Sequence, residues 1–453
     1  MRSHLVHRLM PVCVLAGALA FLAPAAASAS LGQQCSGEAV TGQGAALLKI
    51  AEQNILDPDF NGLGNTNPAA CSGSQGSGGT PAVKYTSTSS GTGLESWGAN
   101  KHGAPSFASS NSFIGTEEPP NPVQKEEIEA SGAPNTLLTI PILQSAIAIV
   151  VHLPTGCTAT STAAPGRLAL AEKTVEKIFA GSDNVWSKIT AKEGGDAFSG
   201  AACTAKILKT DKITRIVRED GAGTTAIIKK YFGLLEKKAV DGTKTWKEIA
   251  EASQNTLWPN ESTVVRAKGD SGLATKVAEV PGSIGYVSLA DARANGDFTP
   301  SKGGGPGTAL FWAEVENRKL PSVTYADPAD NGDVTAKGNS NCEDTTYTNG
   351  KKKFPPPSTS QPWNEVTTSK TETNYPICGF AFALSLTTYS SYPGTTLGEA
   401  TTVNNNILYT LNAGAEGGQQ ELLGNDYLPL PTSATPSLNV LKIAQEGAVT
   451  VGF

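Results

Sequence analysis

Histidine is scarce in this chain. The chain also lacks the cysteine spacing of structural zinc sites and, after its N-terminus, the long apolar run of a membrane-spanning helix. Of its 453 residues only 4 are histidines. His4 and His7 precede an N-terminal apolar run, which leaves His102 and His152 in the rest of the chain. This scarcity excludes most histidine-based metal sites and Ser-His-Asp triads. No C-x-x-C spacing occurs, so a structural zinc site is not expected. No later apolar run has the length of a membrane-spanning helix.

The N-terminus predicts export. Arg2 and Arg8 precede an apolar run from Val12 to Ala23, and small residues follow up to Ala29. This pattern is typical of a secretory signal peptide over residues 1–29, with cleavage near Ala29. The residues before Cys35 do not resemble a lipoprotein attachment box. We therefore expect a secreted or extracytoplasmic protein without a lipid anchor, whose mature part is long enough for two lobes.

The charge balance argues against two kinds of partner. The formal net charge is −6. The predicted signal peptide holds two basic and no acidic residues, so the mature chain would carry −8. An acidic surface is unfavourable for nucleic acid and for anionic membranes. If the ligand is an anion, local hydrogen-bond donors must hold it against the repulsion of the chain's net negative charge.

The cysteine count predicts disulfide bonds. An even number in an exported chain favours a disulfide framework, although six cysteines allow 15 connectivities. Pairing in sequence order would close three loops of a few dozen residues each. The six cysteines outside the signal peptide are Cys35, Cys71, Cys157, Cys203, Cys342 and Cys378.

The stretch from Ile216 to Leu235 predicts half of an anion site. A short apolar strand ends at Arg218, Asp220 follows, and a glycine-rich turn leads into a helix starting at Thr224. A helix start after such a turn exposes unpaired N–H groups and a partial positive charge. With the fork-shaped guanidinium of Arg218 beside it, the stretch can hold a tetrahedral oxyanion.

Two more strand ends have the same character. Residues 41–44 precede a helical pattern over 47–55, and the strand 82–85 runs into a Ser/Thr/Gly-rich turn before Leu94. A third strand, 113–116, ends at Glu117. Ligands of open α/β sheets collect at the carboxyl ends of strands. A buried Glu117 would accept the proton of a phosphate and repel sulfate, which has none to donate.

Strands alternating with helices predict an α/β architecture with mainly parallel pairing. Leu137 to His152 reads as a buried strand, and further strands are expected at 284–287 and 377–386. The segment from Asp291 to Asn374 is polar and loop-rich.

Five motifs in order carry a resemblance to a known family. The chain resembles the phosphate-binding protein of the high-affinity phosphate ABC transporter, in an actinobacterial-like branch of this periplasmic-type solute-binding family. Further similarity resumes at Tyr375–Cys378 and at Asp426–Pro431. The motifs are G-x-G at Gly42–Gly44, Y-x-x-x-x-S-G-x-G-L-x-x-W-G at Tyr85–Gly98, F-I-G-T-E-E-x-P at Phe113–Pro120, R-x-D-x-A-G-T-T at Arg218–Thr225 and P-G-S-I-G-Y at Pro281–Tyr286.

The resemblance implies a two-lobed, type 2 periplasmic-binding-protein-like α/β fold with a ligand cleft between the lobes. Lobe one would comprise 30–143 and 378–453, and lobe two 144–377 with the loop-rich insertion 291–374. The implied function is capture of inorganic phosphate for an ABC transporter permease. It further implies a monomer that makes and breaks no bond and uses no cofactor, metal or nucleic acid.

The resemblance also implies the ligand-binding residues, with three departures. Ala46 lacks the hydroxyl usual in the family, Glu117 replaces its aspartate, and Ala222 replaces a serine. Another oxyanion thus stays an alternative, as does an exported surface protein with a degenerate site. A serine-protease reading of Gly269–Gly272 lacks a histidine in a matching context. The implied phosphate-binding residues are Ala46, Leu47, Ser90, Glu117, Arg218, Asp220, Ala222, Gly223 and Thr224.

Overall fold

The computed structural model describes most of the chain beyond the predicted signal peptide, which itself lies outside the described residues. None of the helices in this described part combines the length and the apolar composition that crossing a bilayer requires. The described residues are 37–61, 82–101, 107, 110–161, 164, 166–189, 198–200, 202–250, 255–298, 309–317, 324–329, 338–342, 346–348, 353–358, 363–370, 374–415 and 417–453.

A large mixed sheet organises the described residues. Its strand order is β2-β1-β3-β16-β4-β10-β8-β9, and β11 and β17 also pair with β4. Its strands are β1 (Val40–Gly44), β2 (Val83–Ser87), β3 (Phe113–Thr116), β4 (Leu137–His152), β8 (Thr214–Arg218), β9 (Val264–Ala267), β10 (Ser283–Ser288), β11 (Leu310–Trp312), β16 (Cys378–Leu386) and β17 (Tyr427–Leu428).

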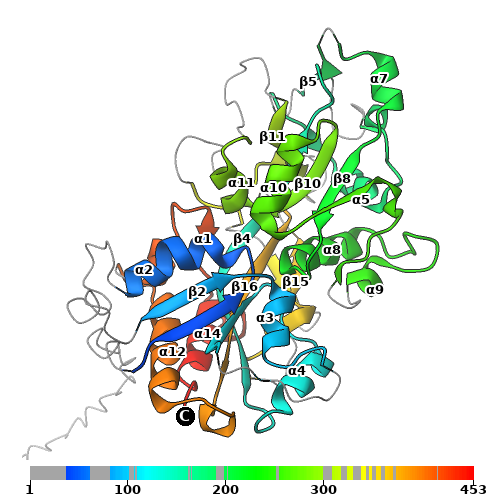
Figure 1. Ribbon diagram of the computed structural model, residues 1–453. Coiled ribbons are helices and arrows are strands. Elements are labelled where there is room, and N and C mark those ends of the chain that lie inside the picture. Colours follow the sequence, from blue (N-terminus) through cyan, green and yellow to red (C-terminus); the bar gives the residue numbers. More distant parts are fainter. Residues whose placement is uncertain are drawn as a thin grey trace, which may run out of the picture. The chain divides into compact units, whose positions relative to one another are not determined.

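The expectation of mainly parallel pairing is wrong at the centre of this sheet. Strands β1, β2 and β3 are parallel, as are β8, β9 and β10, but β4 runs antiparallel to both β16 and β10. The long strand β4 pairs with β16 up to Ala146 and with β10 from Ile147 onward. Because β4 runs out to the second set of strands and β16 runs back, the two are antiparallel neighbours (Figure 1).

Strand β4 forms the centre of the core. Every residue of β4 except His152 is buried, as are all residues of β16. Helices pack against β4, so both of its faces lack solvent contact, which explains its nearly continuous apolar sequence. At Pro141 the register to β16 shifts by one residue, since proline has no N–H to donate.

Helices follow most of the parallel strands. The helix after β1 continues from α1 (Leu48–Ala51) through a π-helical turn (Glu52–Leu56) into α2 (Asp57–Phe60). Helix α8 begins at Gly223, one residue before the expected start, and ends at Leu235 as expected. The other helices are α3 (Ser90–Ser96), α4 (Pro122–Glu129), α5 (Glu172–Ala180), α7 (Ala205–Thr210), α9 (Trp246–Ala250), α10 (Gly269–Glu279), α11 (Leu289–Asn295), α12 (Leu397–Thr410), α13 (Gly418–Glu421) and α14 (Val440–Ala448).

The segment expected to be a loop-rich insertion contains short strands in its described parts. It begins inside helix α11 and packs against the core, because the Tyr347 hydroxyl donates to the Gln144 side chain at 3.0 Å. The Thr139 amide of β4 donates to the Pro357 carbonyl.

The strands outside the large sheet are β5 (Thr158–Ala159), β6 (Ala169–Leu170), β7 (Phe198–Ser199), β12 (Glu314–Glu316), β13 (Tyr325–Ala326), β14 (Thr346–Thr348) and β15 (Thr367–Lys370).

Two of the disulfides expected from pairing in sequence order are confirmed. Cys157 bonds Cys203, and Cys342 bonds Cys378. Cys35 and Cys71 lie outside the described residues. Cys378 is the first residue of β16 and pairs with Ala146 of β4. The second disulfide therefore ties the insertion to the point where β4 changes partners.

We expect the double variant Cys342→Ser/Cys378→Ser to lose about 3–4 kcal/mol of unfolding free energy, because a loop of several dozen residues becomes unconstrained in the unfolded chain. Urea unfolding of the oxidised proteins measures this loss. The Cys157–Cys203 disulfide closes a loop of similar length, so Cys157→Ser/Cys203→Ser should lose a similar amount of unfolding free energy. An unchanged urea midpoint in the first variant would contradict the prediction.

Candidate functional site

The candidate site lies where the parallel strands end and helices begin. Gly44 of β1 pairs with Ser87 of β2 and with Gly115 of β3, so these three strands end at one edge of the sheet. Helix α3 begins three residues after β2. From the other set of strands, β8 ends at Arg218 and leads into α8. The start of α10 joins them, because the Gly269 amide donates to the Asp220 carboxylate at 3.2 Å.

Glu117 receives hydrogen bonds from both sides of the site. It directly follows β3 and is 3% exposed. The Ser90 hydroxyl donates to its Oε2 at 2.6 Å, and the Thr224 hydroxyl donates to its Oε1 at 3.4 Å. The carboxylate thus lies at the N-terminus of α8, where the unpaired N–H groups and the helix dipole favour negative charge. It packs so closely that a Cβ on Gly223 would lie 2.2 Å from Oε2, which requires glycine there.

Arg218 is fixed by two carboxylates. Its Nε donates to Asp220 Oδ1 at 2.9 Å and its Nη2 to Asp220 Oδ2 at 2.5 Å, a two-pronged pair. Its Nη1 donates to Asp270 Oδ1 at 2.9 Å. Asp270 Oδ2 in turn accepts the Thr224 hydroxyl at 3.2 Å. Arg218 and Asp270 are each 1% exposed, so this ion-pair network lies in the interior of the protein.

Burial and mutual repulsion favour the protonated forms of several acids. Burial, helped by the charge of Asp270, raises the pKa of Glu117 to about 7. Burial likewise raises the pKa of Asp270, although Arg218 opposes the shift. For Arg218, burial disfavours the charge, but Asp270 and Asp220 more than offset it and raise the pKa of the guanidinium. The arginine therefore stays charged, and protonation is favoured at Glu117 and Asp270. It is not favoured at Asp220, because burial there is outweighed by the hydrogen bonds and charge of Arg218, which lower the pKa of Asp220.

The two walls of the site touch each other. The Gly91 amide at the start of α3 donates to the Gly221 carbonyl before α8 at 2.9 Å. Nearby, the Asn255 side chain donates to Glu118 Oε2 at 2.6 Å and to the Ala222 carbonyl at 3.0 Å. The strand ends on the Glu117 side and the Arg218 side are therefore in direct contact at these points.

An open cleft of about 540 Å³ leads to the acids of the site. Ala46 lies on its wall, and Asp220 and Asp270 line it as well. Lys49, Lys84 and Lys268 also line the cleft and supply positive charge around it. The cleft is large enough for a small oxyanion with its water shell.

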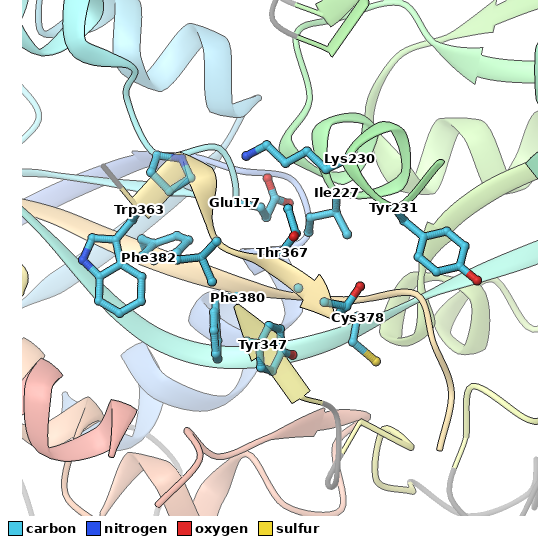
Figure 2. Close-up of a pocket in the computed structure, with 14 residues that line it drawn as sticks. Glu117, Ile227, Lys230, Tyr231, Tyr347, Trp363, Thr367, Cys378, Phe380 and Phe382 are labelled. Carbon is cyan, nitrogen blue, oxygen red and sulfur yellow. The ribbon is translucent and has the colours of Figure 1, made fainter. Parts of the chain in front are cut away.

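A second, small cavity lies on another side of Glu117. It encloses about 30 Å³, room for about one water molecule. Figure 2 shows Glu117 and Ile227 on one side of it and Phe380, Phe382 and Trp363 on the other. Trp363 belongs to the insertion, and its ring lies 5.6 Å from that of Phe382. The insertion thus helps to keep solvent from Glu117.

The structure joins most of the residues that the resemblance implies. Hydrogen bonds connect Ser90, Glu117, Thr224, Arg218 and Asp220 through Asp270. Gly223 lies against Glu117.

The other implied residues lie at the ends of helices. Ala222 is buried as the N-cap residue of α8 and makes no side-chain cap. Ala46 and Leu47 lie just before α1, where the Leu47 carbonyl accepts the Tyr427 hydroxyl at 2.8 Å. No hydrogen bond among the described residues joins Ala46 or Leu47 to the Arg218 network.

Asp270 is the functional candidate that sequence reasoning missed. It lies in the segment Gly269–Gly272, whose sequence suggests a serine-protease motif or a helix start but no anion site. Helix α10 begins at Gly269, and the Ser271 hydroxyl donates to buried Asp291 at 2.9 Å. A glycine-flanked acid at a helix start was the available signal, but nothing in the sequence places that start beside Arg218.

A family model described as a PBP superfamily domain matches residues 74–356. The phosphate-binding protein PstS of Xylella fastidiosa is 33% identical over 131 residues, which is 29% of this chain and 31% of the relative. The match therefore spans less than a third of that relative. The phosphate-binding protein PstS of Haemophilus influenzae is 24% identical over 309 residues, 67% of this chain and 71% of the relative.

Two solved structures show a similar fold. The phosphate-binding protein of Stenotrophomonas maltophilia has a TM-score of 0.55 at 15% identity, covering 90% of this chain and 92% of that one. A human phosphate-binding apolipoprotein has a TM-score of 0.56 at 15% identity, covering 91% of this chain and 93% of that one. At this level of identity the likeness concerns the fold: a two-lobed α/β architecture.

The shifted pKa of Glu117 predicts how its replacement changes stability with pH. A carboxyl whose folded pKa is raised from 4.5 to about 7 loses stability as the pH rises through this interval. Glu117→Gln removes this loss. The unfolding free energy of the variant minus that of the wild type should therefore be larger at pH 8 than at pH 5, by on the order of 3 kcal/mol. Urea unfolding at both pH values measures this difference.

The control for this prediction is Glu279→Gln, which removes one partner of an exposed ion pair with Lys276 on α10. It should change the stability by less than about 1 kcal/mol at either pH. A Glu117→Gln effect that is the same at pH 5 and pH 8 would show that the carboxyl titrates normally.

Proposed function

The chain belongs to the PBP superfamily, and on that premise we propose that it is an extracytoplasmic solute-binding protein that captures inorganic phosphate for an ABC transporter. The observation that carries the proposal is the buried network of Arg218 and Glu117 at the N-terminus of α8. The names of the Xylella and Haemophilus relatives support the same ligand.

The donors of the site suit a tetrahedral anion. The described carboxylates use three of the five N–H donors of an arginine, and the other two can serve an oxyanion. The hydroxyls of Ser90 and Thr224 can turn from Glu117 toward the ligand, and the N–H groups at the start of α8 complete the set. Ala46 and Leu47 would add backbone donors from the opposite wall.

Glu117 would supply the selectivity. A phosphate that still carries a proton can donate it to this carboxylate, whereas sulfate cannot and meets two negative oxygens. The glutamate reaches one methylene further than the aspartate that the resemblance implies. The departures at Ala46 and Ala222 favour a second candidate, an exported interaction protein that retains the fold but has a degenerate site.

The partners and the domain division belong to the same proposal. Lobe one would comprise 30–143 with 378–453, and lobe two 144–377 including the insertion 291–374. The change of β4 from β16 to β10 after Ala146 supports a crossing close to this boundary. The exported monomer would deliver phosphate to a membrane permease and catalyse no reaction. It would lose its signal peptide near Ala29.

Thermal and urea unfolding of the chain without residues 1–29 tests the ligand. Phosphate at about 100 times its dissociation constant should raise the unfolding free energy by about 2.7 kcal/mol. Sulfate at the same concentration should leave it unchanged, because it has no proton for Glu117. No stabilisation by phosphate would reject the transport proposal and favour the interaction protein. Equal stabilisation by sulfate would remove Glu117 from its role.

Arg218→Lys tests the guanidinium while keeping its charge. A lysine cannot bridge two carboxylates and a ligand in a planar fork, so we expect most of the phosphate-dependent stabilisation to be lost. The matched control is Arg215→Lys on the same strand, where the buried guanidinium donates to the carbonyls of Phe179 and Pro259. That variant should lose stability but retain the response to phosphate. Retention of the response in Arg218→Lys would contradict the assignment.

A further inference from the structure

In the structure, carboxylates of the protein occupy the side-chain donors that would hold the ligand. Ser90 donates to Glu117, and Arg218 donates to Asp220 and Asp270. Thr224 donates toward both Glu117 and Asp270. An incoming anion must therefore share these donors with acids that already use them.

The Thr224 hydroxyl marks where the two acids meet. Its oxygen lies 3.4 Å from Glu117 Oε1 and 3.2 Å from Asp270 Oδ2. A hydroxyl has one hydrogen, so it satisfies only one carboxylate at a time. The two acids approach it from different sides, because Asp270 lines the open cleft and Glu117 the small cavity. A ligand oxygen bound to Thr224 therefore has an acid on either side.

The buried groups around Asp270 carry more negative than positive charge, whereas the exposed Lys49, Lys84 and Lys268 line the cleft beside it. Asp270 is faced by Arg218 and Thr224, by Asp220 across the arginine and by Asp291, whose pKa burial and the charge of Asp270 raise to about 7. Tyr427 also lies within electrostatic reach of Asp270.

Glu117 is surrounded in the same way, with Arg218 as a favourable charge and Asp270 as an unfavourable one. Ser90 donates to it, and Lys230 lines the same small cavity. The Tyr85 hydroxyl lies within electrostatic reach of it. One fully buried arginine thus serves several acids, so an added anion needs protons as well as donors.

We propose that Asp270 is a second specificity-determining acid of the anion site and makes anion capture proton-coupled. This inference rests on the proposed function. Each contact between a ligand oxygen and a carboxylate oxygen requires one proton between them, because neither oxygen can donate without it. With Glu117 and Asp270 both beside the ligand, two protons are needed. Monohydrogen phosphate brings one, and the second comes from solvent, so the bound species is equivalent to dihydrogen phosphate between two carboxylates.

The number of protons taken up from solvent per bound phosphate tests the proposed proton coupling directly. Calorimetric titration of the chain without residues 1–29 with inorganic phosphate at pH 8, in two buffers of different ionisation enthalpy, counts the protons. We expect an uptake of about one proton per phosphate, and an affinity that falls about tenfold per pH unit above pH 8. Binding without proton uptake and with a flat pH dependence would overturn the inference while leaving the proposed function intact. Absence of phosphate binding from pH 6 to pH 8 would reject both.

Asp270→Asn assigns the second proton to this residue. The amide can still accept from Arg218 or Thr224 and can donate to a phosphate oxygen without a proton from solvent. We expect uptake at pH 8 to fall close to zero and the tenfold pH dependence to disappear. Asp291→Asn is the matched control, because its carboxylate accepts from Ser271 and Ser288 and not from Arg218 or Thr224.

The control should take up as many protons as the wild type. Undiminished uptake in a folded Asp270→Asn protein would overturn the assignment to Asp270. If that variant does not fold, the wild-type proton count decides whether a second acid takes part. Thr224→Val, which removes the shared hydroxyl at nearly constant volume, then provides the residue-level test: weaker binding with the uptake of about one proton retained is expected. Loss of the uptake in that variant would overturn the role of Asp270.

Discussion

The arrangement of the site depends on one buried ion-pair network around Arg218. A guanidinium in the interior must have acceptors for its N–H groups, and removing one carboxylate from a buried ion pair typically costs several kcal/mol. Asp220 holds it from its own strand end and Asp270 from the start of α10. Asp270 also accepts the Thr224 hydroxyl, so the network brings the starts of α8 and α10 together at one point. The same carboxylates make the site acidic. The Arg218 guanidinium, which attracts an anion, is therefore held by Asp220 and Asp270, which repel one.

Close backbone approach is the second requirement. A Cβ on Gly91 would lie 3.2 Å from the Gly221 carbonyl oxygen, a tight contact, and a Cβ on Gly223 would lie 2.2 Å from Glu117 Oε2, which leaves no space for it. The central strands support this approach, because β4 and β16 are both buried along their lengths and link the strands that carry Glu117 to those that carry Arg218. The disulfide at Cys378 lies where β4 changes partners, so a covalent bond and an insertion contact stabilise this crossing.

Local features of this protein could be predicted from the sequence, whereas contacts between distant segments could not. The β8 to α8 stretch and the strand ending before Glu117 follow from apolar periodicity and glycine turns, which are properties of neighbouring residues. The antiparallel centre of the sheet was missed, because a buried strand has the same apolar composition in either orientation. Asp270 was missed because its partners lie 46 and 52 residues away in the chain. The resemblance implied a set of ligand-binding residues, and Asp270 is not among them.

The replacement of aspartate by Glu117 and the presence of Asp270 are best understood together. A side chain one methylene longer reaches across to the N-terminus of α8, where Thr224 donates to it, while Ser90 at the start of α3 donates to it from the other wall. In that position it satisfies the helix dipole and the hydroxyls of both walls, so the walls can meet around a carboxylate of the protein itself. Burial then raises its pKa to about 7, so its proton can be gained or lost under ordinary conditions. A site closed around its own acid can admit an anion only by changing its protonation or its hydrogen-bond partners. Proton coupling is therefore a consequence of how this chain fills its cleft, rather than an addition to it.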